Sequence, residues 1–577
     1  MHILKGRKKL FDIIFVILVC VLFCFSFLSN ELYVSHDSYF HMNRIVGLTD
    51  AFRDHQFMPK IYPYTNNGYG YATPLFYCDL FLYPFAFLYW IGIPLVVCYK
   101  LMIVFYTFLS IVSILYIGKK MFRNSLLTPY LLTLLYTFSN YRLYDVFSRG
   151  ALGEIFAFVF IPWIFYSIYK IFIKNENSWI MLGVSFALVL MSHNITFALC
   201  CLAFGLFVIF FIVKNRKNKN LLKEKAIIVI KAVIIAVLLS SWYIFPMLEQ
   251  FTSQDFVVNH LSTIYSLKDS TMSLKTIFNP FAILDTVHVH VFKLINVGWP
   301  LIFVPFLYFM LSKEKRNNHI LFMIVLLVII LLVECGWAIW IAKPLTFVQF
   351  VFRFYIIFVP LSSFACAYIL DNLSFGKTFK MLFVVFLIAY SIFNSCLIQY
   401  ESLTYEDIFS DRLTNSSSKE AMYDFSIEKK YRDYNSLEIS GAEYLPSTEI
   451  VDYLDETTFI KEITKDGYLD YIYAFERSFT KIWFDVETDS RKLIMLPQSY
   501  YKGYQAYKVV DGVKEEIETI NVPKYKKVGF YIDEGYGEYY CEYKGTTIQN
   551  VSLLVSGISL VYVICAIIKS SKNRKLI

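Results

Sequence analysis

The stretch FDIIFVILVCVLFCFSFLSNELYVSHDSYFHMNR, residues 11–44, joins a long apolar run to a cluster of ionisable side chains. Residues 11–29 form the apolar part, which is long enough to cross a bilayer as an α-helix. No small-residue cleavage site follows it, and four basic residues precede it: Lys5, Arg7, Lys8 and Lys9. We therefore predict an uncleaved membrane helix whose N-terminal end is cytoplasmic.

The composition is that of a protein with many membrane helices. The chain has 577 residues, of which 57% are hydrophobic and 19% aromatic, and its mean hydropathy is +0.51. One water-excluding core cannot bury that much apolar surface, so the bilayer must cover most of it. The net charge of +8 comes from short Lys and Arg clusters between apolar runs, a pattern of membrane topology rather than nucleic-acid binding. The eleven cysteines lack zinc-type spacing and imply no disulfide framework.

Hydropathy and the basic clusters predict about twelve membrane helices, with both termini in the cytoplasm. The predicted segments are 11–29, 98–118, 125–139, 152–173, 178–192, 195–213, 226–244, 294–312, 319–340, 350–370, 380–399 and 548–568. Residues 79–96 are also apolar, but Pro84 and Pro94 favour an interfacial or re-entrant helix over one that crosses. No internal repeat is visible, whereas an inverted-repeat transporter would more often show one.

We predict three domains from this pattern. Residues 1–399 form a transmembrane domain, with a first outer loop at 30–78 and the interfacial helix at 79–96. Residues 400–546 form an extracytoplasmic domain, and residues 547–577 form the last membrane helix with a basic cytoplasmic tail. In the second half of the extracytoplasmic domain, β-branched and aromatic stretches alternate with Gly-containing turns, which predicts an antiparallel β-sandwich.

Asp37 is the first candidate catalytic residue. It lies a few residues after the first membrane helix, where its carboxylate could act as a general base toward a hydroxyl. The alternative role is an N-cap for a helix that begins near Ser38. His41 follows four residues later, so Asp37 and His41 could also bind a divalent metal. A third ligand is not apparent, so no cofactor is assigned with certainty.

Ionisable residues also lie at the predicted outer ends of other helices, and such groups near hydrocarbon tend to mark functional sites. In YRLYDVFSRGALGEIFAF, residues 141–158, Arg149 could hold a phosphate or could simply pair with Asp145 or Glu154. The two roles are not separated by the sequence.

The stretch FVQFVFRFY, residues 347–355, places Arg353 at the start of a predicted inward-going helix with no obvious local partner. Lys343 precedes it and could snorkel to the surface, and His193 lies at a tight predicted turn. We assign substrate or phosphate contacts to seven residues: Arg353, Arg149, Lys343, His36, His41, Glu154 and His193.

Several short motifs, taken in order, resemble a known family. They are HDSYFHMNRI (36–45), FMPKIYP (57–63), GYGYATPLFY (68–77), YRLYDVFSRGALGE (141–154), SHN (192–194), VQFVFRFY (348–355) and EYLP (443–446). These motifs resemble the bacterial membrane proteins described as 6-pyruvoyl-tetrahydropterin synthase-related, and LPQSYYKGYQAYKVVDG (496–512) is similar to YfhO-like proteins. A first helix, an outer loop that opens with an aspartate and an interfacial helix resemble the plan of GT-C membrane glycosyltransferases. The resemblance implies a GT-C-like fold and no pterin chemistry.

The resemblance also implies a function. The expected reaction is inverting transfer of a sugar from a polyprenyl phosphate to a cell-envelope glycan, at the outer face of the bacterial cytoplasmic membrane. Asp37 then corresponds to the catalytic base, and Arg353 and Arg149 to phosphate-side residues. The expected partners are the lipid bilayer, the lipid-linked donor and the glycan acceptor, without nucleic acid. The alternatives are a transporter or flippase for lipid-linked sugars or polysaccharides, and a non-catalytic scaffold of envelope assembly.

Overall fold

The fold was analysed in a computed structural model of the chain. The residues that it describes are 2–66, 69–260, 267–284, 294–374, 377–405, 412–417, 443–447, 461–462, 471–479, 481–523 and 525–575. The chain divides into two compact units. The first comprises Met1–Met42, Ile93–Ala236 and Ser262–Ser418, and the second comprises Asn43–Gly92, Val237–Leu261 and Lys419–Ile577.

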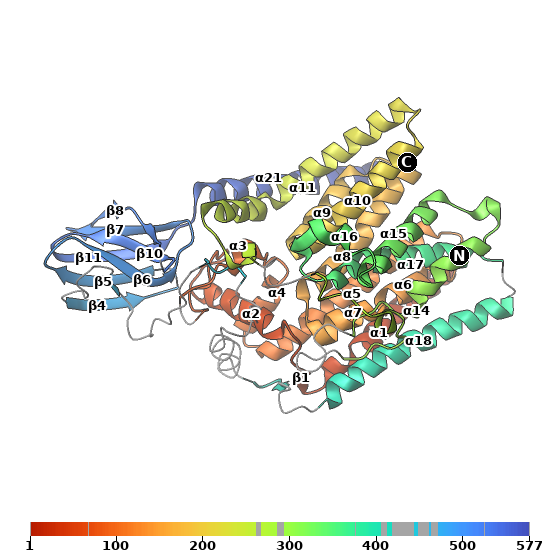
Figure 1. The fold of residues 1–577 in the computed structure, drawn as a ribbon, viewed down its shortest axis with the longest axis horizontal. Helices are drawn as coiled ribbons and strands as arrows, with labels where there is room; N and C mark the ends of the chain where they lie inside the picture. Colours follow the sequence, from red (N-terminus) through yellow and green to blue (C-terminus); the bar gives the residue numbers. More distant parts are fainter. Residues whose placement is uncertain are drawn as a thin grey trace. The chain divides into compact units, whose positions relative to one another are not determined.

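The first unit is built from α-helices. Its helices are α1 His2–Cys24, α5 Leu95–Met121, α6 Thr128–Thr137, α7 Asn140–Tyr144, α8 Leu152–Ile168, α9 Trp179–Ser192, α10 Asn194–Lys214, α13 Leu274–Ile277, α14 Trp299–Phe303, α15 Asn318–Glu334, α16 Ile339–Ala342, α17 Tyr355–Asn372 and α18 Lys377–Thr404. Helix α5 packs on α6 and α8, α8 packs on α9, and α17 packs on α6 and α15 (Figure 1). A short antiparallel pair, β1 Glu31–Tyr33 with β2 Arg412–Thr414, completes this unit.

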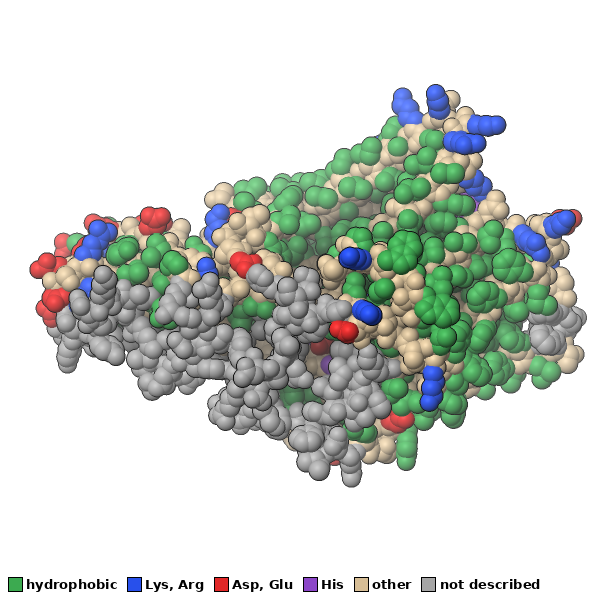
Figure 2. All heavy atoms as spheres, in the orientation of Figure 1, with side chains coloured by type: hydrophobic (Ala, Val, Ile, Leu, Met, Phe, Trp, Pro, Cys, Tyr) green, Lys and Arg blue, Asp and Glu red, His purple; other side chains and the backbone are tan. Residues whose placement is uncertain are grey.

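Helix α1 shows why these segments are membrane helices. From Ile13 onward its sequence is apolar on every side, which is typical of a helix surrounded by lipid and protein rather than water. Val19 and Phe23 are buried against the protein, whereas Ile14 and Leu18 are about half exposed. Apolar side chains also cover much of the visible face of the other helices, and basic side chains gather at the ends of α10 and α11, Lys219–Ser253 (Figure 2).

The described residues contain eight helices that are long and apolar enough to cross a membrane. They are Lys8–Leu28, Leu95–Met121, Leu152–Ile173, Asn194–Lys214, Lys219–Ser253, Val351–Asn372, Met381–Thr404 and Thr547–Lys569. A ninth span is possible if Asn318–Glu334 and Ile339–Val348, which are bent by 96° at their junction, count as one. The predicted class, a multi-span helical membrane protein with a β-rich region before its last helix, is confirmed.

Among the described residues, the candidate spans number eight or nine, fewer than the predicted twelve. Three predicted helices exist but are short: α6 has 10 residues, α9 has 14, and the third covers only Trp299–Met310. At 1.5 Å per residue, even 14 residues extend only about 21 Å, less than the hydrocarbon thickness of roughly 30 Å. Hydropathy alone does not distinguish such helices from spans, because apolar helices packed inside the protein carry the same signal.

The second unit contains a β-sandwich. Its strands are β3 Lys461–Glu462, β4 Tyr471–Arg477, β5 Lys481–Thr488, β6 Lys492–Ser499, β7 Tyr504–Val510, β8 Val513–Ile517, β9 Ile520–Val522, β10 Lys527–Ile532 and β11 Gly535–Tyr543. They form two antiparallel sheets with the orders β3-β6-β10-β9 and β4-β5-β11-β7-β8. Alternate residues such as Ile482, Phe484 and Val486 point inward to a core that includes Ile494 and Phe530 of the other sheet. The predicted antiparallel strands are thus confirmed.

The remaining helices of the second unit are short except at the membrane. They are most of α2 Ser38–Arg53, α3 Thr73–Phe76, α4 Tyr83–Trp90, the end of α11, and α21 Thr547–Lys575. Helix α4 has eight residues, about 12 Å in length, and is too short to cross a bilayer. Its position at a membrane surface stays a prediction, as do the proposed domain limits.

Small polar residues join α11 and α21, which lie side by side (Figure 1). The Ser241 hydroxyl donates to the Ser552 carbonyl at 2.9 Å and lies 2.8 Å from the Ser556 hydroxyl. The Trp242 N–H donates to the same Ser556 hydroxyl at 3.0 Å. Small residues let the two backbones approach closely, so these bonds fix the last helix against α11.

Candidate active site

The backbone of Asp37 is fixed against a distant part of the chain. The His36 N–H donates to the Ser148 carbonyl at 3.1 Å, and the Asp37 N–H donates to the Arg149 carbonyl at 2.8 Å. Helix α2, Ser38–Arg53, begins immediately afterwards, so Asp37 occupies the N-cap position that the sequence suggested as its alternative role. These bonds place the segment around Asp37 directly beside Arg149.

A close contact at Gly150 supports the same arrangement. Gly150 has a φ of +64°, a conformation that residues with a Cβ adopt only with strain. A Cβ at this position would lie 2.2 Å from the Ser35 hydroxyl oxygen. The Ser35 hydroxyl lies 2.5 Å from that of Ser38, which in turn lies 3.3 Å from the Tyr99 hydroxyl. Only glycine fits between this hydroxyl chain and the Arg149 segment.

Arg149 is the centre of a buried ionic cluster. A single π-helical turn, Asp145–Arg149, carries it, and such turns are frequent at functional sites. Its Nη1 donates to Asp145 Oδ1 at 2.6 Å, to Glu154 Oε1 at 2.9 Å and to the Tyr141 hydroxyl at 3.4 Å. The Tyr141 hydroxyl donates to Glu154 Oε2 at 2.6 Å. Both Glu154 oxygens therefore have donors, and Arg149 forms ion pairs with both Asp145 and Glu154.

Arg353 joins this cluster from another helix. Its Nε lies 3.8 Å from Glu154 Oε1, and its guanidinium lies 5.2 Å from the centre of the Phe350 ring. Its Nη1 donates to the Val348 carbonyl at 3.0 Å and to the Gln349 side-chain oxygen. Glu154 thus lies between Arg149 and Arg353, a relation that the sequence did not reveal.

The segment before Arg353 is strained. Gln349 has a φ of +66° and a ψ of −48°, and the Phe350 N–H donates to the Val348 carbonyl at 2.8 Å. This is a γ-turn of the rare form with positive φ. Strained backbone persists only where the surroundings hold it, and here the two bonds from Arg353 do so.

The charges of the cluster depend on one another. Burial alone would lower the pKa of Arg149. The nearby carboxylates, Glu154 first and then Asp145 and Asp37, raise it well above its usual value. Burial and the charge of Glu154 raise the pKa of Asp145 well above its usual value, although the paired Arg149 acts in the opposite direction. Asp37 interacts electrostatically with both Arg149 and Arg353.

His193 lies in the same electrostatic environment. It is the N-cap of α10, and its Nδ1 accepts the Thr196 N–H at 3.4 Å. Burial and the charges of Arg353 and Arg149 lower the pKa of His193 to about 3. The charge of Glu154 acts in the opposite direction but is outweighed. The imidazole is therefore neutral at physiological pH.

The structure brings five of the predicted site residues together: Asp37, Arg149, Glu154, His193 and Arg353. His36 adds its backbone bond to Ser148. His41 is buried and its N–H donates to the Asp37 carbonyl, which is the first bond of α2. Lys343 is exposed at the start of a 3₁₀-helical segment. It forms no hydrogen bond or ion pair with any residue that the structure describes.

Sequence reasoning missed three features of the site: the bridging role of Glu154, the hydroxyl chain of Ser35, Ser38 and Tyr99, and the γ-turn at Gln349. Gly150, directly after Arg149, was a signal for the close approach of the hydroxyl chain, because glycine permits a positive φ. In the described ranges, no group of three or more His, Cys, Asp and Glu side chains is arranged to hold a metal ion.

Comparison with known proteins supports the resemblance seen in the sequence. Residues 75–402 match the 6-pyruvoyl-tetrahydropterin synthase related domain, described as a membrane protein, over more than half of the chain. The chain belongs to this family. The matched segment of this PTPS-related protein contains Arg149, Glu154, His193 and Arg353, whereas Asp37 lies before it.

Two individual proteins are similar to this PTPS-related chain. An uncharacterised protein of Lactococcus lactis subsp. cremoris (strain MG1363) is 26% identical over 262 residues, which are 44% of this chain and 42% of that protein. The cryo-EM structure of the mycobacterial arabinofuranosyltransferase AftD is similar over 69% of this chain and 27% of AftD, with 14% identity and a TM-score of 0.40. The chain thus spans less than half the length of either protein.

Proposed function

We propose that this protein is a GT-C-type glycosyltransferase that transfers a sugar from a polyprenyl phosphate to a cell-envelope glycan. The observation that carries the proposal is the placement of Asp37. Its backbone is bonded to that of Arg149, and its carboxylate interacts electrostatically with two guanidinium groups. A carboxylate base beside two cations is the combination that hydroxyl attack on a sugar phosphate ester requires.

The proposed step is a single displacement. Asp37 takes the proton of the acceptor hydroxyl as its oxygen bonds to the anomeric carbon. The bond between that carbon and the phosphate oxygen breaks, and the polyprenyl phosphate leaves with the bonding electrons. Arg149 and Arg353 stabilise the negative charge that develops on the leaving phosphate. Attack from the face opposite the leaving group inverts the anomeric configuration.

Asp37 suits the base better than its acidic neighbours do. Glu154 has both oxygens engaged, one by Arg149 and the other by Tyr141. Asp145 is completely buried and pairs with Arg149. Asp37 is half-buried at the start of α2, so a substrate can reach its carboxylate.

The donor is proposed to approach from the outer face of a bacterial cytoplasmic membrane. The basic clusters, such as Lys214, Arg216 and Lys217 after α10, favour a cytoplasmic location for that end of the helices. This orientation would place Asp37 on the opposite side. Both the orientation and the glycan acceptor are parts of the proposal.

The proposal is tested by mass spectrometry of envelope glycans from a deletion strain that is complemented with variants. Asp37→Asn should leave the glycan unmodified at normal expression. Asp54→Asn is the matched control, because Asp54 is exposed near the other end of α2. Restored modification by Asp37→Asn would exclude Asp37 as the base.

A transporter is the second candidate, and one observation favours it. Both carboxylate oxygens of Glu334 are buried and have no hydrogen-bond partner in the part of the chain that the structure describes. Glu334 lies within electrostatic reach of Tyr355, at the 96° break between Asn318–Glu334 and Ile339–Val348. Buried acids at broken helices are typical of transport sites. In the same complementation test, a transporter would require Glu334, so Glu334→Gln would abolish modification and Asp37→Asn would not.

A further inference from the structure

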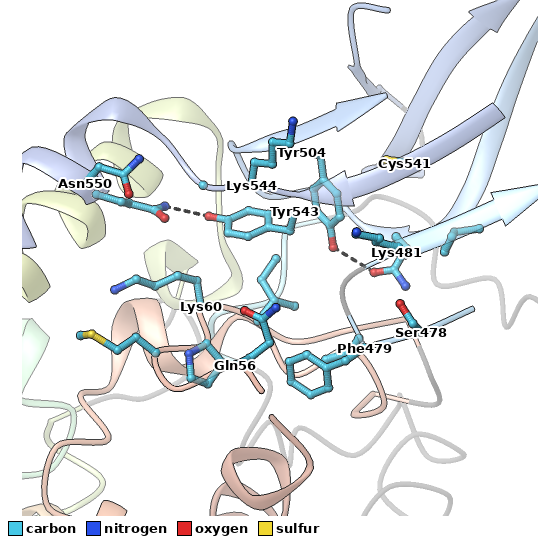
Figure 3. Close-up of a pocket in the computed structure, with 18 of the residues that line it drawn as sticks. Gln56, Lys60, Ser478, Phe479, Lys481, Tyr504, Cys541, Tyr543, Lys544 and Asn550 are labelled. Atoms are coloured by element: carbon cyan, nitrogen blue, oxygen red, sulfur yellow. Dashed lines mark hydrogen bonds between the residues drawn. The ribbon is translucent and has the colours of Figure 1, made fainter. Parts of the chain in front are cut away.

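A cavity of about 240 Å³ lies inside the second unit, where no residue of the proposed transfer site contributes. Its walls come from the loop 56–63, from the sandwich strands and from the start of α21. In Figure 3, the rings of Tyr504 and Tyr543 enter from one side, and Gln56, Lys60 and Phe479 enter from the other. Aromatic rings, amides and lysine side chains therefore line the same small volume.

The charge of the cavity is positive. Among the described residues that line it, Lys60, Lys481 and Lys544 are basic and none is acidic. Lys481 and Lys544 share one nearby carboxylate, Glu542, at 3.5 and 3.4 Å. Lys60 has no carboxylate within ion-pair distance among the described residues. With three lysines and one nearby carboxylate, the cavity lining would present a net positive charge to an anion.

Lys60 is held in an environment that favours a bound anion. Its ammonium lies 5.3 Å from the centre of the Trp242 ring, and the two interact as cation and π-system. Burial lowers the pKa of Lys60, and an anionic ligand would offset that effect. Lys60 is half-buried at the cavity wall, so a ligand in the cavity can reach it.

A buried amide adds a directional contact. Gln498 is 5% exposed, and its side-chain oxygen accepts the Tyr504 hydroxyl at 2.9 Å. Its amide nitrogen makes no hydrogen bond to any residue that the structure describes. On another wall, the Gln549 amide donates to the Tyr543 hydroxyl at 2.7 Å, which fixes the orientation of that ring. Oriented rings with nearby amides are suited to the apolar face and hydroxyls of a sugar.

We propose that this cavity binds one acidic sugar unit, a pyranose that carries a carboxylate or a phosphate, through Lys60, Gln498 and the rings of Phe479 and Tyr543. The role of that unit as part of the acceptor glycan rests on the proposed function. The binding itself does not, because it needs neither the donor nor Asp37.

The test is saturation-transfer-difference NMR on the full chain in phosphatidylcholine nanodiscs, without any donor. Glucuronate and glucose 6-phosphate should receive saturation and glucose should receive much less. Lys60→Gln should weaken glucuronate binding at least fivefold, whereas Lys60→Arg should retain it. Lys514→Gln is the matched control, because Lys514 also lies over a tyrosine ring, 4.2 Å from its centre, but is exposed outside the cavity.

Several results would overturn the proposal. The first is equal saturation of glucose and glucuronate, and the second is unchanged glucuronate binding by Lys60→Gln. The third is displacement of glucuronate by inorganic phosphate at the concentration at which glucose 6-phosphate displaces it. Loss of glucuronate binding in nanodiscs that contain phosphatidylglycerol would assign the cavity to a lipid headgroup instead. Asp37→Asn should bind glucuronate as the wild type does, so loss of transfer with intact binding would contradict only the proposed function.

Discussion

The Asp37 loop and the Arg149 segment can meet only because residue 150 is glycine. Its φ is positive, and the Ser35 hydroxyl oxygen lies only 2.2 Å from the point that a Cβ of residue 150 would occupy. A larger residue therefore has no room there. The loop that carries the proposed base thus depends on a residue with no side chain.

Gly150→Ala should accordingly destabilise the protein by about 1–3 kcal/mol, because it combines backbone strain with displacement of Ser35. Thermal unfolding of the purified protein measures this effect. Gly205→Ala is the control, since a Cβ there meets nothing within 4 Å and Gly205 lies inside helix α10, where alanine is favoured. A Gly150→Ala protein as stable as the Gly205→Ala protein would contradict the close approach.

The neutral state of His193 gives a pH dependence. Its folded pKa is about 3 and its ordinary value is 6.5, so between these values the unfolded chain binds a proton that the folded chain does not. Stability should be complete above pH 6.5 and should fall, by up to a few kcal/mol, as the pH drops from 6.5 toward 3.

His193→Asn should flatten this loss, because asparagine still caps α10 but does not titrate. Unfolding temperatures at pH 7 and pH 4 provide the measurement. His55→Asn, at an exposed position, should retain the wild-type acid sensitivity. An equal loss of stability in the His193→Asn protein would show that other groups cause it.

Five site residues could be named from the sequence because ionisable side chains at the ends of apolar helices are conspicuous. Their partners could not be named. Glu154 pairs with Arg353 across nearly two hundred positions of sequence, and no local pattern encodes that contact. Lys343 is also basic and lies near Arg353 in sequence, but it is exposed, since short 3₁₀ turns point it elsewhere.

At the scale of the element, the γ-turn at Gln349 positions Arg353 through two acceptors, the Val348 carbonyl and the Gln349 side chain. Replacing Gln349 by alanine or by glycine removes the same side-chain contact. Only alanine also retains the cost of a positive φ.

Gln349→Ala should therefore be less stable than Gln349→Gly by roughly 1 kcal/mol. Both variants should lower the affinity for the lipid-linked donor, because the Arg353 guanidinium is less well fixed. Parallel thermal unfolding of the two variants gives the difference. Identical unfolding temperatures would mean that the γ-turn is not maintained in the protein.

The elements themselves were predicted unequally well. Strands such as β5 and β11 could be predicted because β-branched and aromatic stretches recur with turns between them. Alternate residues of these stretches fill the core between the two sheets. The predicted spans outnumber the candidate spans of the described residues because α6 and α9 are short apolar helices that pack against other helices of the first unit. Length, not hydropathy, separates the two cases.

At the scale of the whole molecule, the basic clusters predict one orientation. The residues after α10 and the basic end of α21 should both be cytoplasmic, and the sandwich should lie outside. Green fluorescent protein fused to the C-terminus should fluoresce, and alkaline phosphatase fused after residue 546 should be active. An inactive phosphatase at 546 together with a non-fluorescent C-terminal fusion would reverse the orientation and remove the outer-face site.

The account depends on the Asp37 carboxylate acting as a base beside Arg149 and Arg353. The most direct measurement is release of free polyprenyl phosphate by purified protein in nanodiscs, supplied with lipid-linked sugars and envelope glycan from bacterial membranes. Asp37→Asn should bind the donor but release polyprenyl phosphate at least about 100-fold more slowly than wild type and Asp54→Asn. Release by Asp37→Asn at the wild-type rate would contradict the account.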